Sequence, residues 1–294
     1  MKNLITSRRT RTALVGGVVL VLALAGWVTS ALAITWGAPD SDNEYANVGA
    51  FFVERADGRK WAVCTGTLIA PQVFLTAAHC TDYVEDLDSA GQLVGVYVSF
   101  DFDVSLDEDP VLLDVDEVIT HPNYNDFEDA SNPYDVGALI LAEPVMDITP
   151  AGLPEVGLLD DLKRDGVLRS GAGSANGWAG PDGAKFTVVG YGGVLEWPPP
   201  DIAYEDQRRF GESEYVALVP AQLHMDQNRL HDNQGTCFGD SGGPAFWEPD
   251  GDTRVLVGIT SWGDAQCVVT GFDYRVDIPD TLDFIESVFA GLQQ

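Results

Sequence analysis

The chain has 294 residues, of which 45% are hydrophobic and 21% charged, and its formal net charge at pH 7 is −30. This composition supplies a packed core and excludes a globally disordered chain. The negative charge argues against nucleic acid as a partner, because binding phosphates requires clustered Lys and Arg. Two interpretations of the charge remain open, a plain solvated acidic surface and adaptation to a salty medium that screens the repulsion.

The first 33 residues have the layout of a secretory signal peptide. A basic start precedes an apolar run over residues 13–28, and Ala31-Leu32-Ala33 offers a small-x-small cleavage site. An uncleaved membrane anchor is the alternative, because residues 13–33 are long enough to span a bilayer. We expect removal of residues 1–33, which leaves a secreted, extracellular chain of residues 34–294 that has no membrane contact.

Short runs of β-branched and aromatic residues, separated by turn residues, dominate the chain after residue 33. They cover residues 61–68, 93–102, 111–119, 136–141, 185–191, 215–219, 255–262 and 272–278. Pro249-Asp250-Gly251 has the composition of a hairpin turn between two strands. Many short strands with turns between them predict an all-β barrel or sandwich.

Helical patterns are scarce in this sequence. Residues 156–168 are consistent with a short helix, and the clearest pattern covers about 281–290. There Leu282, Ile285 and Phe289 fall on one helical face, and Asp280 is the expected N-cap.

The segment Gly239-Asp240-Ser241-Gly242-Gly243 fits the Gly-x-Ser-x-Gly elbow of the α/β-hydrolases. That fold requires a catalytic histidine after the serine. All four histidines precede Ser241. The order of residues and the scarcity of helices therefore exclude this interpretation.

A second pattern combines four separated segments. They are Leu-Thr-Ala-Ala-His-Cys at 75–80, Asn-Pro-Tyr-Asp-Val-Gly-Ala-Leu at 132–139, Gly-Asp-Ser-Gly-Gly-Pro at 239–244 and Ser-Trp-Gly at 261–263. Together, and in this order, they resemble the motifs of the chymotrypsin-like, or trypsin-like, serine peptidase family. The resemblance covers roughly residues 34–294. It implies two antiparallel β-barrels of the six-stranded type, over about 34–145 and 146–280, followed by the C-terminal helix.

The resemblance also implies roles in peptide-bond hydrolysis. Ser241 would be the nucleophile, His79 the general base and then acid, and Asp135 the residue that orients His79. A serine hydroxyl needs such a base because it is a weak nucleophile at neutral pH. The N–H groups of Gly239 and Ser241 would form the oxyanion hole.

Four cysteines in an exported chain suggest two disulfides, with three connectivities open from the count alone. The resemblance implies the pairs Cys64–Cys80 and Cys237–Cys267. No Cys-x-x-Cys or His-Glu-x-x-His pattern indicates a zinc site.

The start of the expected mature chain resembles the activating N-terminus of the family. Ile34 directly follows Ala33, and Asp240 precedes the serine. By resemblance, the free ammonium of Ile34 would be buried against Asp240 and shape the oxyanion hole. Signal peptidase itself would then create the active terminus, without a propeptide.

The resemblance assigns the contacts to the substrate residue before the cleaved bond. They are Gly235, Thr236, Ser261, Trp262, Gly263 and Asp273. Gly235 stands at the pocket base, where a member that cleaves after Arg or Lys would have Asp, so we expect an apolar or mid-sized residue there. A basic residue is the alternative, if the Asp273 carboxylate points inward.

No cofactor is implied. The acidic runs 85–88 and 101–109 are expected to be solvated surface, with calcium binding as the alternative. We expect a monomer that acts on proteins or peptides. A catalytically silent homologue that serves as a secreted binding protein, and an esterase, are the competing functions.

Overall fold

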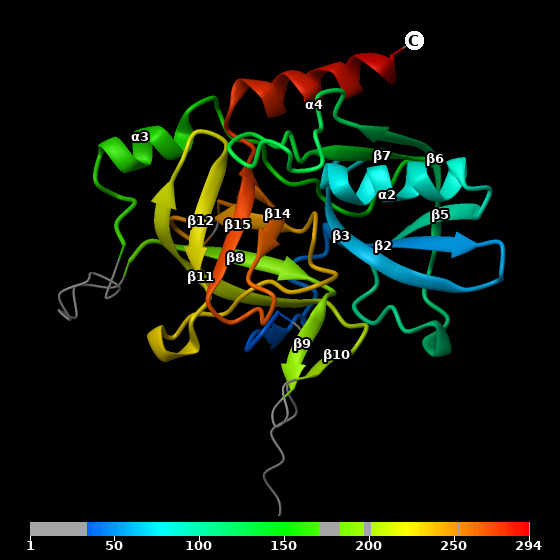
Figure 1. Cartoon of the computed structure of the whole chain (residues 1–294), viewed down its shortest axis with the longest axis horizontal. Helices are drawn as coiled ribbons and strands as arrows, with labels where there is room; N and C mark the ends of the chain where they lie inside the picture. The colour runs from blue at the N-terminus through cyan, green and yellow to red at the C-terminus, as the bar shows by residue number, and fades with distance from the viewer. Residues whose placement is uncertain (1–33, 171–182, 197–200, 252, 294) are drawn as a thin grey trace, which may run out of the picture. The chain divides into compact units, whose positions relative to one another are not determined.

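The computed structural model describes residues 34–170, 183–196, 201–251 and 253–293 (Figure 1). The expected signal peptide, residues 1–33, lies outside the described residues. In the part that is described, no helix is both long and apolar enough to cross a membrane.

The first barrel is a closed sheet of six antiparallel strands. In order around the barrel these are β2 (Val48–Arg55), β3 (Lys60–Ala70), β4 (Val73–Thr76), β7 (Gly137–Leu141), β6 (Leu113–Thr120) and β5 (Leu93–Ser99). Its interior is filled by large apolar side chains such as Phe51, Phe74 and Leu139, which are fully buried. Each such burial stabilises the fold by about 1.5–3 kcal/mol.

The second barrel has the same strand number and also closes on itself. In order these strands are β11 (Arg209–Leu218), β12 (Gln222–Asp226), β15 (Thr270–Arg275), β14 (Val255–Gly263), β13 (Pro244–Trp247) and β8 (Lys185–Gly190), which pairs back onto β11. The short strand β1 (Ala38–Pro39) adds to β11, and β9 (Gly193–Glu196) with β10 (Asp201–Tyr204) forms a separate hairpin. The predicted pair of six-stranded antiparallel barrels is confirmed.

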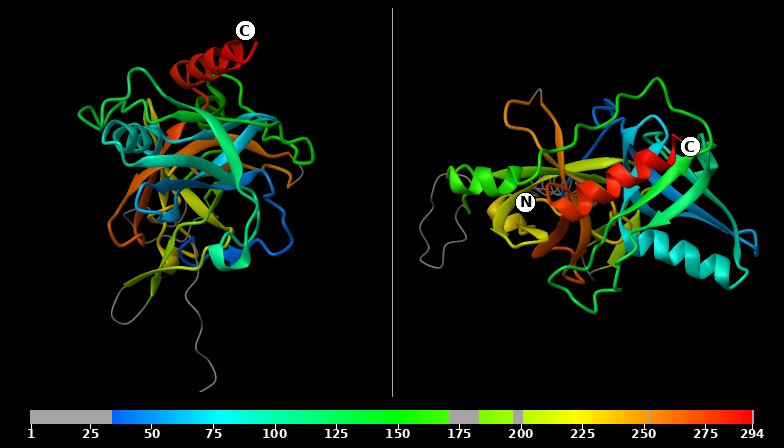
Figure 2. Two further views of the ribbon diagram at one scale, coloured as in Figure 1. Left: turned by 90° about the vertical axis from the view of Figure 1, so that its right-hand side faces the viewer. Right: turned by 90° about the horizontal axis from the view of Figure 1, so that it is seen from above.

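Within the described residues, three α-helices accompany the barrels: α2 (Ala78–Ser89), α3 (Leu158–Arg164) and α4 (Pro279–Gly291). Helix α4 packs Phe284, Ile285 and Val288 into the larger apolar core, on the side opposite the β9–β10 hairpin (Figures 1 and 2). The C-terminal helix was predicted, but its N-cap is Ile278 rather than Asp280. Pro279 fixes the first helical turn, and Asp280 lies in that turn, where its charge favours the helix dipole.

Candidate active site

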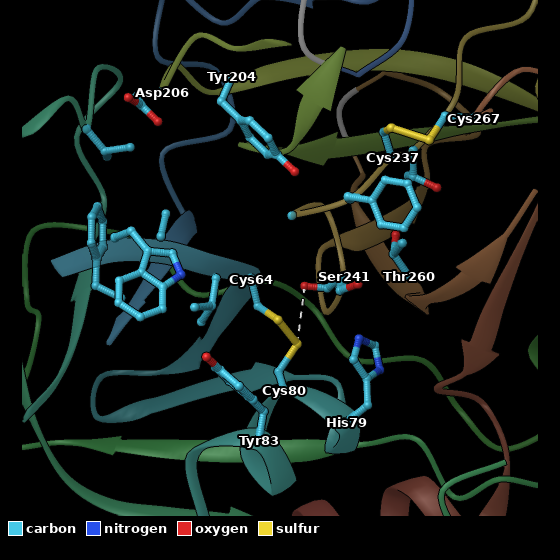
Figure 3. Close-up of a pocket in the computed structure, with 18 of the residues that line it drawn as sticks. Cys64, His79, Cys80, Tyr83, Tyr204, Asp206, Cys237, Ser241, Thr260 and Cys267 are labelled. Atoms are coloured by element: carbon cyan, nitrogen blue, oxygen red, sulfur yellow. Dashed lines mark hydrogen bonds between the residues drawn. A yellow bond between two sulfur atoms is a disulfide. The ribbon is translucent and has the colours of Figure 1, made fainter. Parts of the chain in front are cut away.

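The expected catalytic residues come from both barrels: His79 and Ser241 line one cleft, and Asp135 lies behind His79, outside the cleft lining. His79 lies in the first turn of α2, directly after β4, and Asp135 lies just before β7. Ser241 lies in the loop that leads into β13 of the second barrel. Ser241 and His79 lie side by side in the wall of a cleft of about 1110 Å³ (Figure 3).

Asp135 is fully buried and holds His79 through two donors. His79 Nδ1 lies 3.0 and 3.1 Å from the two carboxylate oxygens, and the backbone N–H of His79 donates to Oδ1 at 2.9 Å. Ser261 Oγ donates to Oδ2 at 2.5 Å. These contacts satisfy the buried carboxylate and fix the orientation of the imidazole.

The environment of His79 changes its basicity. Burial alone would lower the pKa of His79, but the charge of Asp135 and the hydrogen bond to it raise the pKa above its ordinary value. No hydrogen bond joins Ser241 Oγ to the imidazole in the described part of the chain. Such bonds often tighten only when substrate binds.

The serine loop has a backbone that only glycine adopts readily. Gly239 and Gly242 have φ angles of 96° and 82°, in the left-handed region. A Cβ at Gly239 would approach Gly192 Cα to 2.9 Å. Among the described residues, the N–H groups of Gly239 and Ser241 have no protein acceptor, so both are free to bind an oxyanion.

Thr65, on β3 of the first barrel, is hydrogen-bonded to the same loop. Its N–H donates to the Ser241 carbonyl at 2.8 Å, and its hydroxyl donates to the Gly239 carbonyl at 2.9 Å. The hydroxyl also accepts the N–H of Tyr191 at 3.2 Å. Sequence reasoning missed Thr65, because contacts across 174 residues leave no local pattern.

The expected activation pair lies in the second barrel. Ile34 is fully buried, and the backbone of Thr35 exchanges two hydrogen bonds with Gly235, at 2.7 and 3.2 Å. Asp240 is fully buried and accepts N–H groups from Gly192 at 2.7 Å and Cys237 at 2.8 Å. Burial raises the pKa of Asp240 to about 7, although these two bonds oppose the shift.

The expected substrate contacts divide into two groups. Those that line the cleft are Thr236, Ser261, Trp262 and Gly263. Gly235 and Asp273 are not part of the cleft lining. Gly235 is covered by Gln227, whose side chain would lie 2.5 Å from a Cβ at that position.

Gln227 is a second residue that sequence reasoning missed. It follows β12, and its Nε2 donates to Thr236 Oγ1 at 2.9 Å. Its Oε1 is buried and has no partner among the described residues. Gln227, like Gly235, is not part of the cleft lining, and its amide packs behind Thr236 and Gly235.

Asp273 lies on β15, opposite Thr260 of β14 and Leu223 of β12. It is fully buried, and neither carboxylate oxygen has a hydrogen-bond partner in the described part of the chain. Burial raises the pKa of Asp273 to about 8. A carboxyl in this environment is neutral over much of the pH range.

Both disulfides have the pairing that the resemblance implied. They join Cys64 to Cys80 and Cys237 to Cys267, with Cα–Cα distances of 6.4 and 5.1 Å. Cys64, His79 and Cys80 form the one group of three potential metal ligands within the described ranges. The disulfide removes the thiolates that a metal would require. The acidic runs 85–88 and 101–109 do not bring three carboxylates together.

The family model described as Trypsin matches residues 34–285, which include both barrels and all the residues of the cleft.

Proposed function

The chain belongs to the trypsin family of serine-type endopeptidases, and we propose that it is a secreted enzyme that hydrolyses peptide bonds through an acyl-enzyme on Ser241. The observation that carries the proposal is the buried Asp135 carboxylate, which holds the imidazole of His79 beside Ser241. The substrates are proteins or peptides. No described residue set points to a cofactor.

The mechanism follows from these positions. His79 removes the proton of Ser241 as its Oγ attacks the carbonyl carbon, and Asp135 stabilises the imidazolium that forms. The N–H groups of Gly239 and Ser241 bind the oxyanion of the tetrahedral intermediate. His79 then protonates the leaving amine, and water hydrolyses the acyl-enzyme by the same route.

The residue before the cleaved bond is apolar or mid-sized in this proposal. Thr236 lines the cleft with a small neutral side chain, and the side chain packed behind it and behind Gly235 is the neutral amide of Gln227. Cleavage after basic residues through Asp273 is less well supported, because that carboxyl lies outside the cleft lining and its burial favours the neutral form.

Gln227→Ala tests this assignment. The smaller side chain leaves space behind Gly235 and Thr236, so the preferred residue before the cut should shift from mid-sized to large aromatic side chains. A peptide library measures the shift, and an unchanged preference would show that Gln227 does not limit the size of that residue.

Activation completes the proposal. Removal of residues 1–33 frees the amine of Ile34, and its ammonium enters the second barrel to pair with Asp240. The burial of both residues supports this pairing. A mature N-terminus at Ile34, measured by N-terminal sequencing or mass spectrometry, is the expected result; a start further downstream would contradict it.

Labelling with a fluorophosphonate probe at neutral pH tests the nucleophile. The secreted protein should react, and Ser241→Ala and His79→Ala should not. A folded chain that starts at Ile34 and does not react would be the silent binding homologue. Turnover of esters without turnover of peptides would identify an esterase.

A further inference from the structure

The cleft extends well beyond Ser241, on the side away from the Cys237–Cys267 disulfide. Figure 3 shows this part continuing past the Cys64–Cys80 disulfide towards Tyr83, Tyr204 and Asp206. Beside the buried Phe52 and Val104, this part is lined by six half-buried or exposed apolar side chains, those of Trp61, Ala62, Val63, Tyr83, Leu106 and Tyr204. We call these six residues the apolar wall.

The direction in which a substrate peptide runs through the cleft indicates which of its residues this part binds. In the proposed function, residues before the cut lie along Ser261–Gly263 and against Thr236, on one side of Ser241. An extended peptide that passes Ser241 must therefore leave over the Cys64–Cys80 disulfide. We propose that the apolar wall binds aromatic or branched aliphatic side chains in the first two positions after the cleaved bond. This inference rests on the proposed function.

Large side chains of the wall are open to solvent in the free enzyme. Leu106 is 47% exposed and Tyr204 is 57% exposed. They come from different elements, the short 3₁₀ turn Leu106–Glu108 and strand β10, and both face the same cleft. Clustered exposed apolar side chains of this kind are typical of binding surfaces.

The charged residues of this region disfavour acidic substrates. Lys60, the one cation in the cleft lining, is paired with Glu54 at 3.1 Å and lies over the Tyr97 ring at 4.1 Å. Asp107 and Asp206 also line this part of the cleft. No described Lys or Arg forms an ion pair with either. An Asp or Glu after the cut would meet these carboxylates without a free cation.

Most of the apolar side chains that line the cleft belong to the apolar wall, so the larger apolar area lies on the leaving side. Recognition should therefore depend more on the residues after the cut than on the residue before it.

Acyl transfer to added amines tests the inference directly. The mature enzyme is acylated by an N-blocked amino-acid ester, and amino-acid and dipeptide amides then compete with water for the acyl-enzyme. The amine attacks the carbonyl carbon of the acyl-enzyme and forms a peptide bond as the bond to Ser241 Oγ breaks. His79 takes the proton of the amine and passes it to the departing Ser241 oxygen. Nucleophiles that carry Phe, Trp or Leu should partition at least about 10-fold better than those that carry Gly or Asp.

Variants of the wall give the second readout. Trp61→Ala and Tyr204→Ala should each reduce the preference for Phe over Gly several-fold. Because the partition ratio is measured within one variant, a change in its overall rate does not affect the result. Leu106→Ala should also lower the ratio, whereas Leu230→Ala, which changes a side chain 91% exposed and outside the cleft, should leave it unchanged.

The outcomes separate the two proposals. If no acyl-enzyme forms, the proposed function fails and the inference fails with it. If the acyl-enzyme forms but apolar, basic and acidic nucleophiles partition equally, the inference alone is overturned. A preference for Lys or Arg nucleophiles would also overturn it, and would assign recognition to Asp107 and Asp206.

Discussion

Thr65 connects the first barrel to the backbone that should bind the oxyanion. Its hydroxyl donates to the Gly239 carbonyl, so it fixes the position of a residue whose N–H has no acceptor among the described residues. Thr65→Val keeps the shape of the side chain and removes this bond. We expect kcat to fall at least about 10-fold with a small change in KM, because the bond matters most when charge develops on the substrate oxygen.

Thr65→Ser is the matched control, because it keeps the hydroxyl and should retain most of the activity. Inhibition by a boronate that mimics the tetrahedral state should weaken in parallel with kcat in the Val variant. If kcat were unchanged while the unfolding midpoint fell, Thr65 would have a structural role only.

The protonation of His79 should determine how activity depends on pH. Asp135 raises the pKa of His79, and only the neutral imidazole can accept the proton of Ser241. Activity should therefore be lost as pH falls through a pKa above the ordinary value of about 6.5. The acid limb of kcat/KM against pH measures this pKa in the free enzyme. An acid limb below about 6 would contradict the raised pKa of His79.

At the scale of elements, strands β12, β15 and β14 determine the substrate side of the second barrel. Trp262 stacks on Phe272 with ring centroids 3.9 Å apart, and Phe272 stacks on His224 at 4.3 Å. This stack crosses all three strands and holds Trp262 in the cleft wall. The next residue of β15, Asp273, is buried between the same strands.

Asp273 should make stability depend on pH. Its pKa is about 8 in the folded state and about 4 when unfolded, so between these values the folded chain holds a proton that the unfolded chain has released. Stability therefore falls as pH rises across this window, by at most about 1.4 kcal/mol per pH unit from this group. Asp273→Asn removes this titrating group. The free energy of unfolding of the variant, relative to that of the wild type, should therefore increase from pH 5 to pH 8, as measured by urea unfolding at several pH values. If the free energies of unfolding of the two proteins changed in parallel with pH, the carboxyl of Asp273 would have a hydrogen-bond partner or water in solution.

The sequence predicted elements best where the pattern was local. Strand runs such as 185–191 and the helix near 281–290 correspond to β8 and α4. Helix α2 was missed, although Cys80, Val84 and Leu87 bury one of its faces, because acidic residues alternate with them and no side chain caps its start. Thr65 and Gln227 were missed for another reason: their roles depend on contacts between distant segments, which only the folded chain brings together.

At the scale of the whole molecule, the two barrels must keep a fixed relation, because His79 and Ser241 belong to different barrels. Arg208 ties them together and is fully buried. It donates to the carbonyls of Val48 and Phe100 at 3.1 and 2.9 Å in the first barrel, and to the Tyr191 hydroxyl at 2.8 Å. Its Nε donates to Asp40 at 2.7 Å, so the segment after Ile34 shares the same anchor. The segment that follows Ile34 is thereby coupled to the interface that forms the cleft.

The formal net charge is −30 for the full chain and −34 for residues 34–294, because residues 1–33 contain four Lys and Arg and no acidic residue. Repulsion among 46 acidic residues opposes the compact state and is weakened by salt, since the screening length shortens from about 30 Å at 0.01 M to about 3 Å at 1 M. We expect the melting temperature of the mature protein to rise steadily as KCl increases over this range. A surface that is merely solvated would give a melting temperature that is indifferent to salt. Repeating the series with a chloride salt of a different monovalent cation distinguishes general screening from a specific cation site, because screening requires the two curves to coincide.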